Sequence, residues 1–321
     1  MSGKHSFEAQ ISALEALREQ PEETRLAALR KGLGAKNNFL AGKAADLIRE
    51  FDLKILVPEL LIAFDRLFEN AEKTDPQCWA KNAISRTLAA FEHQDPEVFL
   101  RGMGHIQMEP VYGGRADTAG TLRSICALAL VTCRRLTERD LLTHLLDLLA
   151  DKDKNVRAEV ARAIEQVGSP TASLLLRLRA TVGNDEPEVL GACHAGVLRI
   201  EGKGAIPWAA RFLAAADDTS AEVALAIASL RCEDAFQALK VALGNTRDPW
   251  FRSVLLSAVG LTRQESAADF LFEVVQKESL DAEAAIESIV RSMPSKENIE
   301  RLKKLVAGNL RLEAVLSRQQ K

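Results

Sequence analysis

One apolar spacing recurs eight times along this chain and restricts its possible folds more than any other feature. Apolar or small residues follow the pattern 0, +4, +7, +8, +11, which places them on a single stripe of an α-helix. The first members of the eight matches are Leu40, Ala80, Leu122, Val156, Val189, Thr219, Phe251 and Ala282. Successive matches start 40, 42, 34, 33, 30, 32 and 31 residues apart, so the sequence predicts a repeated helical unit.

A second kind of helix is expected between these stripes. Segments such as 138–150 and 268–277 carry charge on one face. Asp-Pro or Glu-Pro pairs separate the two kinds of helix, because an acidic cap followed by Pro at the first helical position favours a helix start. These pairs lie at 75–76, 95–96, 186–187 and 248–249. The expected fold is all-α, an α-solenoid of about eight helix–turn–helix repeats in which each repeat buries its stripe against its neighbours.

We expect one solenoid domain over residues 1–321. Its expected parts are an N-terminal cap helix within 1–21, longer and divergent repeats over 22–137 with an insertion loop at 105–117, regular repeats over 138–307, and a C-terminal cap or tail over 308–321. The two end segments would cover the apolar surface that terminal repeats otherwise expose.

Composition and charge exclude several classes of protein. Hydrophobic residues make up 47% of the chain and charged residues 27%, and the net charge is -3, which gives no basic footprint for nucleic acid. The N-terminal sequence MSGKHSFEAQ lacks the apolar segment of a signal peptide, and the apolar runs are too short for a membrane span. Five cysteines without a CxxC pair indicate free thiols in a reducing compartment. We therefore expect a cytoplasmic protein without a membrane segment.

The segment LLTHLLDLLADKDKNVRAEVARAIEQVGS, residues 141–169, resembles a bacterial HEAT repeat of the kind also found in phycobilisome-lyase-like proteins. The resemblance covers about residues 22–307 and is strongest over 138–293. It implies an armadillo-like superhelix in which an Asp in the turn and an Arg early in the second helix link neighbouring repeats. The residues that match this ladder are Asp153 with Arg157, Asp248 with Arg252, and Arg123 without its Asp.

The segment HIQMEPVYGGRAD, residues 105–117, lies between expected helices at about 96–104 and 118–133. It is longer than the other turns, and long loops in compact repeats often carry function. Its apolar residues and Gly-Gly pair favour an ordered turn over disorder. The candidate partner-binding residues within it are His105, Met108, Glu109, Tyr112, Arg115 and Asp117. We consider three roles for this loop, which are bracing the neighbouring repeat, binding a partner or ligand, and catalysis.

The stripe-bearing helices are apolar almost all round. Opposite the stripe, at +2, they carry Gly42, Asn82, Ser124, Ala158, Gly191, Ala221, Ser253 and Ala284. Either tight curvature closes this layer on itself, or the layer lines a groove that accepts a partner. Trp79 and Trp250, both at −1, and His194 at +5 are further candidate partner contacts. The two Trp side chains could instead pack under the turns.

No residue set predicts a catalytic, cofactor or metal site. The loop's acid and base side chains come without a nucleophile motif, a phosphate-binding glycine loop or HExxH, and the histidines lack metal-ligand spacing. We therefore predict a non-enzymatic protein-binding scaffold or adaptor. The resemblance leaves a lyase-type or cofactor-handling subunit as an alternative, with Tyr112 and Asp117 beside an apolar pocket as its site. A nucleic-acid-binding helical repeat is a third reading, disfavoured by the lack of Lys and Arg in the +2 column.

Overall fold

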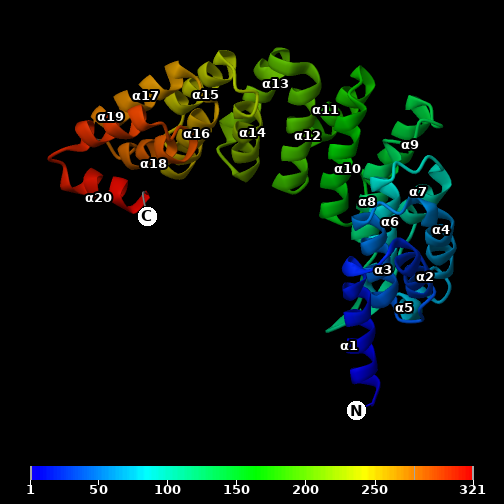
Figure 1. The fold of residues 1–321 in the computed structure, drawn as a ribbon. Helices are drawn as coiled ribbons and strands as arrows, with labels where there is room; N and C mark the ends of the chain where they lie inside the picture. The colour runs from blue at the N-terminus through cyan, green and yellow to red at the C-terminus, as the bar shows by residue number, and fades with distance from the viewer. Residues whose placement is uncertain (1, 278, 320–321) are drawn as a thin grey trace. The chain divides into compact units, whose positions relative to one another are not determined.

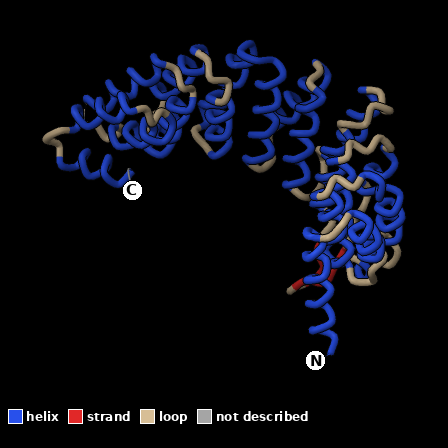
Figure 2. The backbone as a smooth tube through the Cα atoms, viewed as in Figure 1, coloured by secondary structure: helices blue, strands red, loops and turns tan. Residues whose placement is uncertain are grey.

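The computed structural model describes residues 2–277 and 279–319, and nearly all of them are helical or lie in short connections (Figure 2). The expected all-α helical repeat fold is confirmed, with one small two-stranded element as the exception among these residues. The chain divides into two compact units, residues 1–167 and 168–321, where the sequence suggested one continuous domain. Each unit is described by itself. Positions 1, 320 and 321 of the expected caps lie outside the described residues.

Unit 1 consists of two layers of helices. Its elements are α1 (Ser2–Glu15), η1 (Ala16–Glu19), α2 (Glu22–Leu33), α3 (Asn38–Glu50), η2 (Lys54–Leu56), α4 (Val57–Arg66), α5 (Ala71–Thr74), η3 (Pro76–Cys78), α6 (Trp79–Ala90), α7 (Pro96–Met103), β1 (Met108–Val111), β2 (Gly114–Asp117), α8 (Gly120–Leu130), α9 (Glu138–Leu148) and α10 (Lys154–Val167). Helices α3, α6, α8 and α10 contact one another in sequence and form the second-helix layer. Helices α2, α4, α7 and α9 pack against them as the first-helix layer (Figure 1).

Unit 2 repeats this arrangement. Its elements are α11 (Pro170–Val182), α12 (Pro187–Glu201), η4 (Gly202–Ala205), α13 (Ile206–Ala210), η5 (Arg211–Ala215), α14 (Asp218–Ala228), α15 (Glu233–Asn245), α16 (Pro249–Leu261), α17 (Glu265–Gln276), α18 (Ala282–Ser292), α19 (Lys296–Val306) and α20 (Leu310–Gln319). The second-helix layer runs through α12, α14, α16, α18 and α20, each in contact with the next (Figure 1).

The apolar stripes form the core of each unit. All eight first members of the spacing pattern lie in second helices, and seven of them are buried, with Thr219 half-buried. Each fully buried Val, Leu, Ile or Phe side chain stabilises the folded state by about 1.5–3 kcal/mol relative to an exposed one. The stripes therefore supply the energy that holds neighbouring repeats together.

The Asp-Pro pairs start helices at two of the three positions where they occur. Asp95 precedes Pro96 at the start of α7, and its carboxylate accepts a hydrogen bond from a backbone N–H of the first turn. Asp248 does the same before Pro249 at the start of α16. In both cases the carboxylate satisfies a donor that the helix itself leaves free.

The third pair, Asp75-Pro76, departs from this pattern. Gln77 and Cys78 both adopt left-handed backbone conformations, with φ of 57° and 53°, so α6 begins only at Trp79. Left-handed non-glycine residues are costly and persist where surrounding contacts hold them. The 75–78 turn therefore needs support from elsewhere in the chain.

The helices nearest the two chain ends each contact two neighbouring helices. Helix α1 contacts α2 and α3 in unit 1, and α20 contacts α18 and α19 in unit 2. Among the described residues, no helix combines the length and the apolar character that crossing a bilayer requires.

Candidate functional site

The connection between α7 and α8 is a β-hairpin formed by the segment singled out in the sequence. Strands β1 and β2 are antiparallel, with Met108 opposite Asp117 and Val111 opposite Gly114. Tyr112 and Gly113 form the two-residue turn, where Gly113 has φ 89°, a conformation that glycine adopts without strain. We call residues 110–114 the tip of the hairpin, and residues 105–109 and 115–117 its base. The sequence pattern did not reveal these strands.

The base of the hairpin forms hydrogen bonds with the strained 75–78 turn of the preceding repeat. The Glu109 carboxylate accepts a hydrogen bond from the Gln77 backbone N–H at 2.7 Å. The Gln107 side chain donates to the Asp75 carbonyl at 2.9 Å and accepts from the Cys78 thiol at 3.3 Å. Both Gln107 and Glu109 are buried. The base thus supplies the support that the turn requires.

Beneath this turn lies a buried ion pair that the sequence analysis missed. Lys81 and Asp75 are fully buried, and the Lys81 ammonium lies 3.1 Å from the Asp75 carboxylate. The ammonium also donates to the Leu67 carbonyl at 3.1 Å and lies over the Phe68 ring. Asn38 of the preceding repeat donates to the same carboxylate at 2.9 Å. Asp75 therefore joins two repeats through one buried charge.

A sequence signal for Lys81 existed. It stands one residue after the first member of its stripe, in the same column as the three arginines of the expected ladder, Arg123, Arg157 and Arg252. The column carries a cation in four of the eight stripes, whereas the sequence analysis considered only arginine. A comparison by column would have identified it.

The other side of the base is fixed by Arg123, whose side chain is 5% exposed. Its guanidinium donates to Asp117 at 2.7 Å and to the His105 carbonyl at 3.0 Å. It also binds Asp151 of the next repeat with two parallel hydrogen bonds of 2.8 and 3.0 Å. Such bidentate pairs fix geometry as well as charge. Arg123 therefore connects the hairpin base to the repeat that follows.

Ionisable side chains at the base of the hairpin take part in these contacts. Burial favours a higher pKa for Glu109, but hydrogen bonds from Gln107 and the Gln77 N–H outweigh it and hold the pKa below its usual value. The same balance, with backbone N–H donors and Arg123, lowers the pKa of Asp117. Burial lowers the pKa of His105, whose Nε2–H donates to Gln107 at 2.9 Å. At neutral pH the base of the hairpin therefore contains two carboxylates and a neutral imidazole.

The expected ladder is present in modified form. Arg252 binds Asp281 of the next repeat at 2.6 Å, as the ladder requires. Arg157 donates to backbone carbonyls of its own turn. Asp153 and Asp248 accept hydrogen bonds from backbone N–H groups at the start of their own helices. The turn aspartates thus act as helix caps, and a further acidic residue pairs with the arginine.

The tip of the hairpin, in contrast, stands free of the helices. Tyr112 is fully exposed, and Val111 is half-exposed. A methyl group built on Gly113 or Gly114 would meet no atom within 4 Å. Arg115 forms an exposed ion pair with Glu72 at 2.7 Å and also donates to the Met108 carbonyl. Ile106 and Met108 add exposed apolar surface along the same segment, so the hairpin presents bare apolar side chains on an anchored base.

The second-helix layer of unit 1 is open beside the hairpin. Trp79 is 50% exposed and its ring lies 5.6 Å from the Phe39 ring, so it does not pack under the turn. Next to it is a cavity of about 440 Å³ lined by Asp46, Gln77, Trp79, Asn82, Ala83, Arg86, Thr118 and Thr121. A second cavity of about 350 Å³ lies between α8 and α10. Both cavities lie on the second-helix layer of unit 1.

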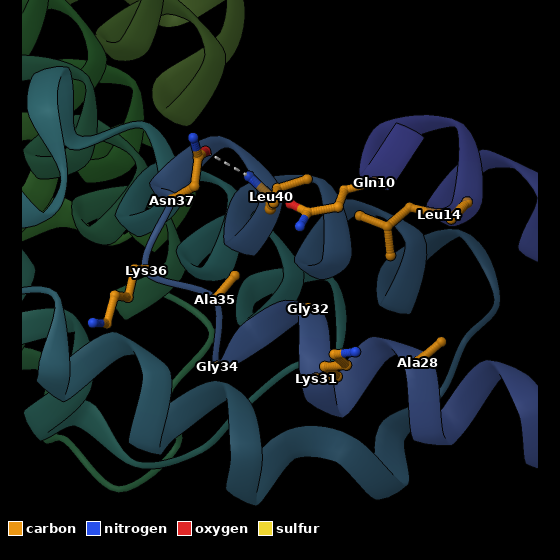
Figure 3. A pocket seen from close by; sticks show the side chains of 11 residues that line it. Gln10, Leu14, Ala28, Lys31, Gly32, Gly34, Ala35, Lys36, Asn37 and Leu40 are labelled. Atoms are coloured by element: carbon orange, nitrogen blue, oxygen red, sulfur yellow. Dashed lines mark hydrogen bonds between the residues drawn. The ribbon is translucent and has the colours of Figure 1, made fainter. Parts of the chain in front are cut away.

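A third cavity, of about 640 Å³, lies at the N-terminal end of unit 1 between α1, α2 and the start of α3 (Figure 3). Leu14 and Gln10 of α1 line one side, and Ala28 and Lys31 of α2 line the other (Figure 3). The Asn37 side chain, at its edge, caps α3 by accepting from two backbone N–H groups. This cavity lies beside the contacts that α1 makes with α2 and α3.

Two candidate residues lie in unit 2. Trp250 is 47% exposed on α16, so it is accessible as expected of a partner contact. His194 is fully buried, stacked on Trp208 at 5.0 Å and edge-on to Phe212 at 4.5 Å. Its assignment as a partner contact was wrong, because the +5 position of α12 faces the aromatic side chains of α13 and η5. Burial also lowers the pKa of His194.

No arrangement for catalysis or metal binding emerges among the described residues. Tyr112 and Asp117, the pair considered for cofactor chemistry, lie at opposite ends of the hairpin. Burial raises the pKa of the Cys78, Cys126 and Cys193 thiols to about 12, which leaves them protonated and unreactive. Groups of three or more potential metal ligands are also absent from the described chain.

Comparison with known proteins adds no family assignment, since neither the protein-family models nor the curated proteins include a match to this chain.

Proposed function

We propose that this protein is a non-enzymatic, HEAT-like scaffold of the cytoplasm that binds a protein partner through the 105–117 hairpin and the adjoining second-helix layer of unit 1. The observation that carries the proposal is the division within the hairpin. Its base is hydrogen-bonded to two neighbouring repeats, whereas Tyr112 and Val111 at its tip are exposed. Exposed aromatic and apolar side chains on a rigid support are typical of interface anchors.

The anchored base favours binding energetically. An isolated two-stranded hairpin is only marginally stable in water. Here Glu109 and Asp117 hold both strands to the helices before any partner arrives. The entropy of ordering the loop is therefore lost on folding, and a partner does not have to supply it.

The same contacts argue for binding rather than catalysis. The acid and base side chains of the segment already form hydrogen bonds within the protein. They are His105, Glu109 and Asp117, and their partners are Gln107, backbone N–H groups and Arg123. A general acid or base must be free to exchange a proton with a substrate. These three groups serve the architecture of the hairpin.

Site-specific crosslinking tests the proposal. A benzophenone amino acid replaces Tyr112 in one variant and Leu146 in a control, since Leu146 is an exposed apolar residue on α9. We expect a discrete crosslinked protein from position 112 in the native cells and none from position 146. The adduct should disappear on adding an excess of unlabelled wild-type protein, and persist with an excess of the Val111→Ser/Tyr112→Ser variant. Equal labelling at both positions would contradict the proposal.

A further inference from the structure

The two cavities on the second-helix layer of unit 1 lie next to each other, and we call them together the track. The first is lined by α3, α6 and the start of α8, and the second by α8 and α10. Thr121 lines both of them, so the start of α8 is their shared wall. The track begins at the foot of the hairpin, because Gln77 and Thr118 belong to the first cavity and both are neighbours of its base.

The first cavity offers a cation and an unsatisfied amide. Arg86 is exposed and has no ion-pair partner among the described residues, whereas Asp46 in the same lining is paired with Arg49 at 2.8 Å. The Asn82 side-chain oxygen is buried without a hydrogen-bond partner in the described chain. An unsatisfied buried polar atom costs about 1–3 kcal/mol, which a ligand N–H recovers once the amide turns towards it. Trp79 adds a half-exposed ring beside both groups.

The second cavity has the opposite charge. Its lining contains the carboxylates of Asp153 and Glu159 and no Lys or Arg. Glu159 pairs with Arg162 outside the lining, and Asp153 caps α10. The same cavity is lined by the apolar side chains of Ile125 and Leu128 on α8.

The distance between the cavities selects a peptide conformation. Arg86 lies on α6 and Glu159 on α10, and α8 packs between these two helices. Packed helices lie about 8–10 Å apart, and an extended chain advances about 3.3 Å per residue, so about five or six residues span the two helix spacings. A helical ligand would instead require one uninterrupted apolar groove. The cation in the first cavity and the carboxylates in the second suit an extended chain.

We propose that the track binds an extended peptide segment with an acidic and a basic side chain about five or six residues apart. The inference rests on the proposed function, for which it specifies the chemistry of the partner. The acidic side chain pairs with Arg86, the basic side chain lies at Asp153 and Glu159, and the peptide backbone satisfies Asn82. Complementary charge at both ends fixes the direction of the segment and discriminates against like-charged peptides.

An array of synthetic peptides tests this inference with the full-length protein. All peptides have the same apolar and polar framework, and two positions about five or six residues apart carry every combination of Glu, Lys and Ala, in both orders. We expect wild-type protein to retain the Glu/Lys combination in one order about tenfold better than the Ala/Ala peptide. Retention independent of the charges at the two positions would overturn the inference.

Charge reversal in the protein assigns the contact. Arg86→Glu should shift the preference at the acidic position to Lys, and Asp153→Asn should weaken the preference for Lys at the basic position while keeping the helix cap. The control is Arg139→Glu, the same charge change on exposed α9, which should leave the preferences unchanged. Unchanged melting temperatures confirm that all three variants fold. Preferences that shift equally with the control would contradict the assignment.

The two proposals fail separately. If position 112 crosslinks a partner but Arg86→Glu leaves both the peptide preference and that adduct unaffected, the track is not the peptide site and the scaffold function stands. If the peptides bind with the expected charge rule but position 112 yields no adduct, the track is correct and the hairpin tip is not the docking element.

Discussion

Two connections between first and second helices perform the same structural task with very different lengths. The α15–α16 connection in unit 2 comprises residues 246–248, whereas the α7–α8 connection in unit 1 comprises residues 104–119. In the short one, Arg252 donates to the Thr246 carbonyl at 2.8 Å and binds Asp281 of the next repeat. In the long one, Arg123 makes the equivalent contacts with the His105 carbonyl and Asp151.

The comparison distinguishes the residues that link two repeats from the residues that the α7–α8 connection has in addition. Three residues and one arginine are enough to link two repeats, so the length of the α7–α8 connection is not required for that link. Part of the added segment, including Gln107 and Glu109, supports the strained 75–78 turn. The tip, residues 110–114, is exposed. It is the part of the insertion that we propose for binding.

The two connections should differ most in the free energy of unfolding that is lost when the arginine of each is replaced. Arg123→Met leaves Asp117 and Asp151, 26% and 10% exposed, without their cation and should lower the free energy of unfolding by about 3 kcal/mol. Arg252→Met should cost about 1 kcal/mol, because Arg252 and Asp281 are 26% and 23% exposed and water compensates the loss. Urea unfolding of both variants measures this. Equal losses would show that the two linkages are equally buried.

Removing the hydrogen bonds at the base of the hairpin should have the next largest effect on the free energy of unfolding. Glu109→Leu leaves the Gln77 N–H and the Gln107 side chain without their acceptor, and should lower the free energy of unfolding by about 2 kcal/mol. Glu72→Leu is the matched control, because Glu72 makes an exposed ion pair with Arg115 and its loss should cost about 0.5 kcal/mol. If the two variants melt at the same temperature, the base does not support the 75–78 turn.

Acidification should weaken both units through one histidine in each, half-buried His105 and buried His194. Burial lowers the pKa of His105 at the hairpin base and of His194 in unit 2 below 6.5. Below that pH the unfolded chain binds more protons than the folded one, so the free energy of unfolding falls as the pH falls, by at most about 1.4 kcal/mol per pH unit for each histidine.

Equilibrium unfolding between pH 7 and 5 measures this slope. His194→Gln should reduce it, and so should His105→Gln. A slope that neither substitution alters would place the pH dependence elsewhere.

The smallest effect on stability is expected at the tip. Val111→Ser/Tyr112→Ser should change the free energy of unfolding by less than about 0.5 kcal/mol, because both side chains are exposed and Tyr112 contacts solvent throughout. Differential scanning calorimetry provides the comparison with Glu109→Leu. A loss as large as that of the base variant would make the tip part of the fold.

The sequence predicted the repeats because their signal is local. Eight apolar stripes at near-constant spacing identify the second helices, and seven of the eight first residues are buried as expected. Caps such as Asp95 and Asp248 were also correct, since an N-cap depends on residues within one turn. The periodic part of the fold was therefore readable from the chain alone.

The parts of the fold that the sequence did not predict depend on contacts between residues that are distant in the chain. The short strands β1 and β2 carry no clear alternation of apolar and polar residues, and Glu109 holds them through a turn 32 positions earlier. Asp75-Pro76 resembles the other caps, yet Gln77 and Cys78 turn left-handed under that long-range support. His194 was misjudged for the same reason, because the rings that bury it come from the next helix pair along the chain.

Amide hydrogen exchange across residues 105–117 tests the division between base and tip most directly. The N–H groups of Gln77 and Gln107, which donate to Glu109 and Asp117, should exchange as slowly as those of the surrounding helices. The N–H groups of Tyr112 and Gly113 should exchange at nearly the rate of an unstructured peptide. Rapid exchange throughout the segment would show that the hairpin has no anchored base, and slow exchange throughout would show that it has no free tip.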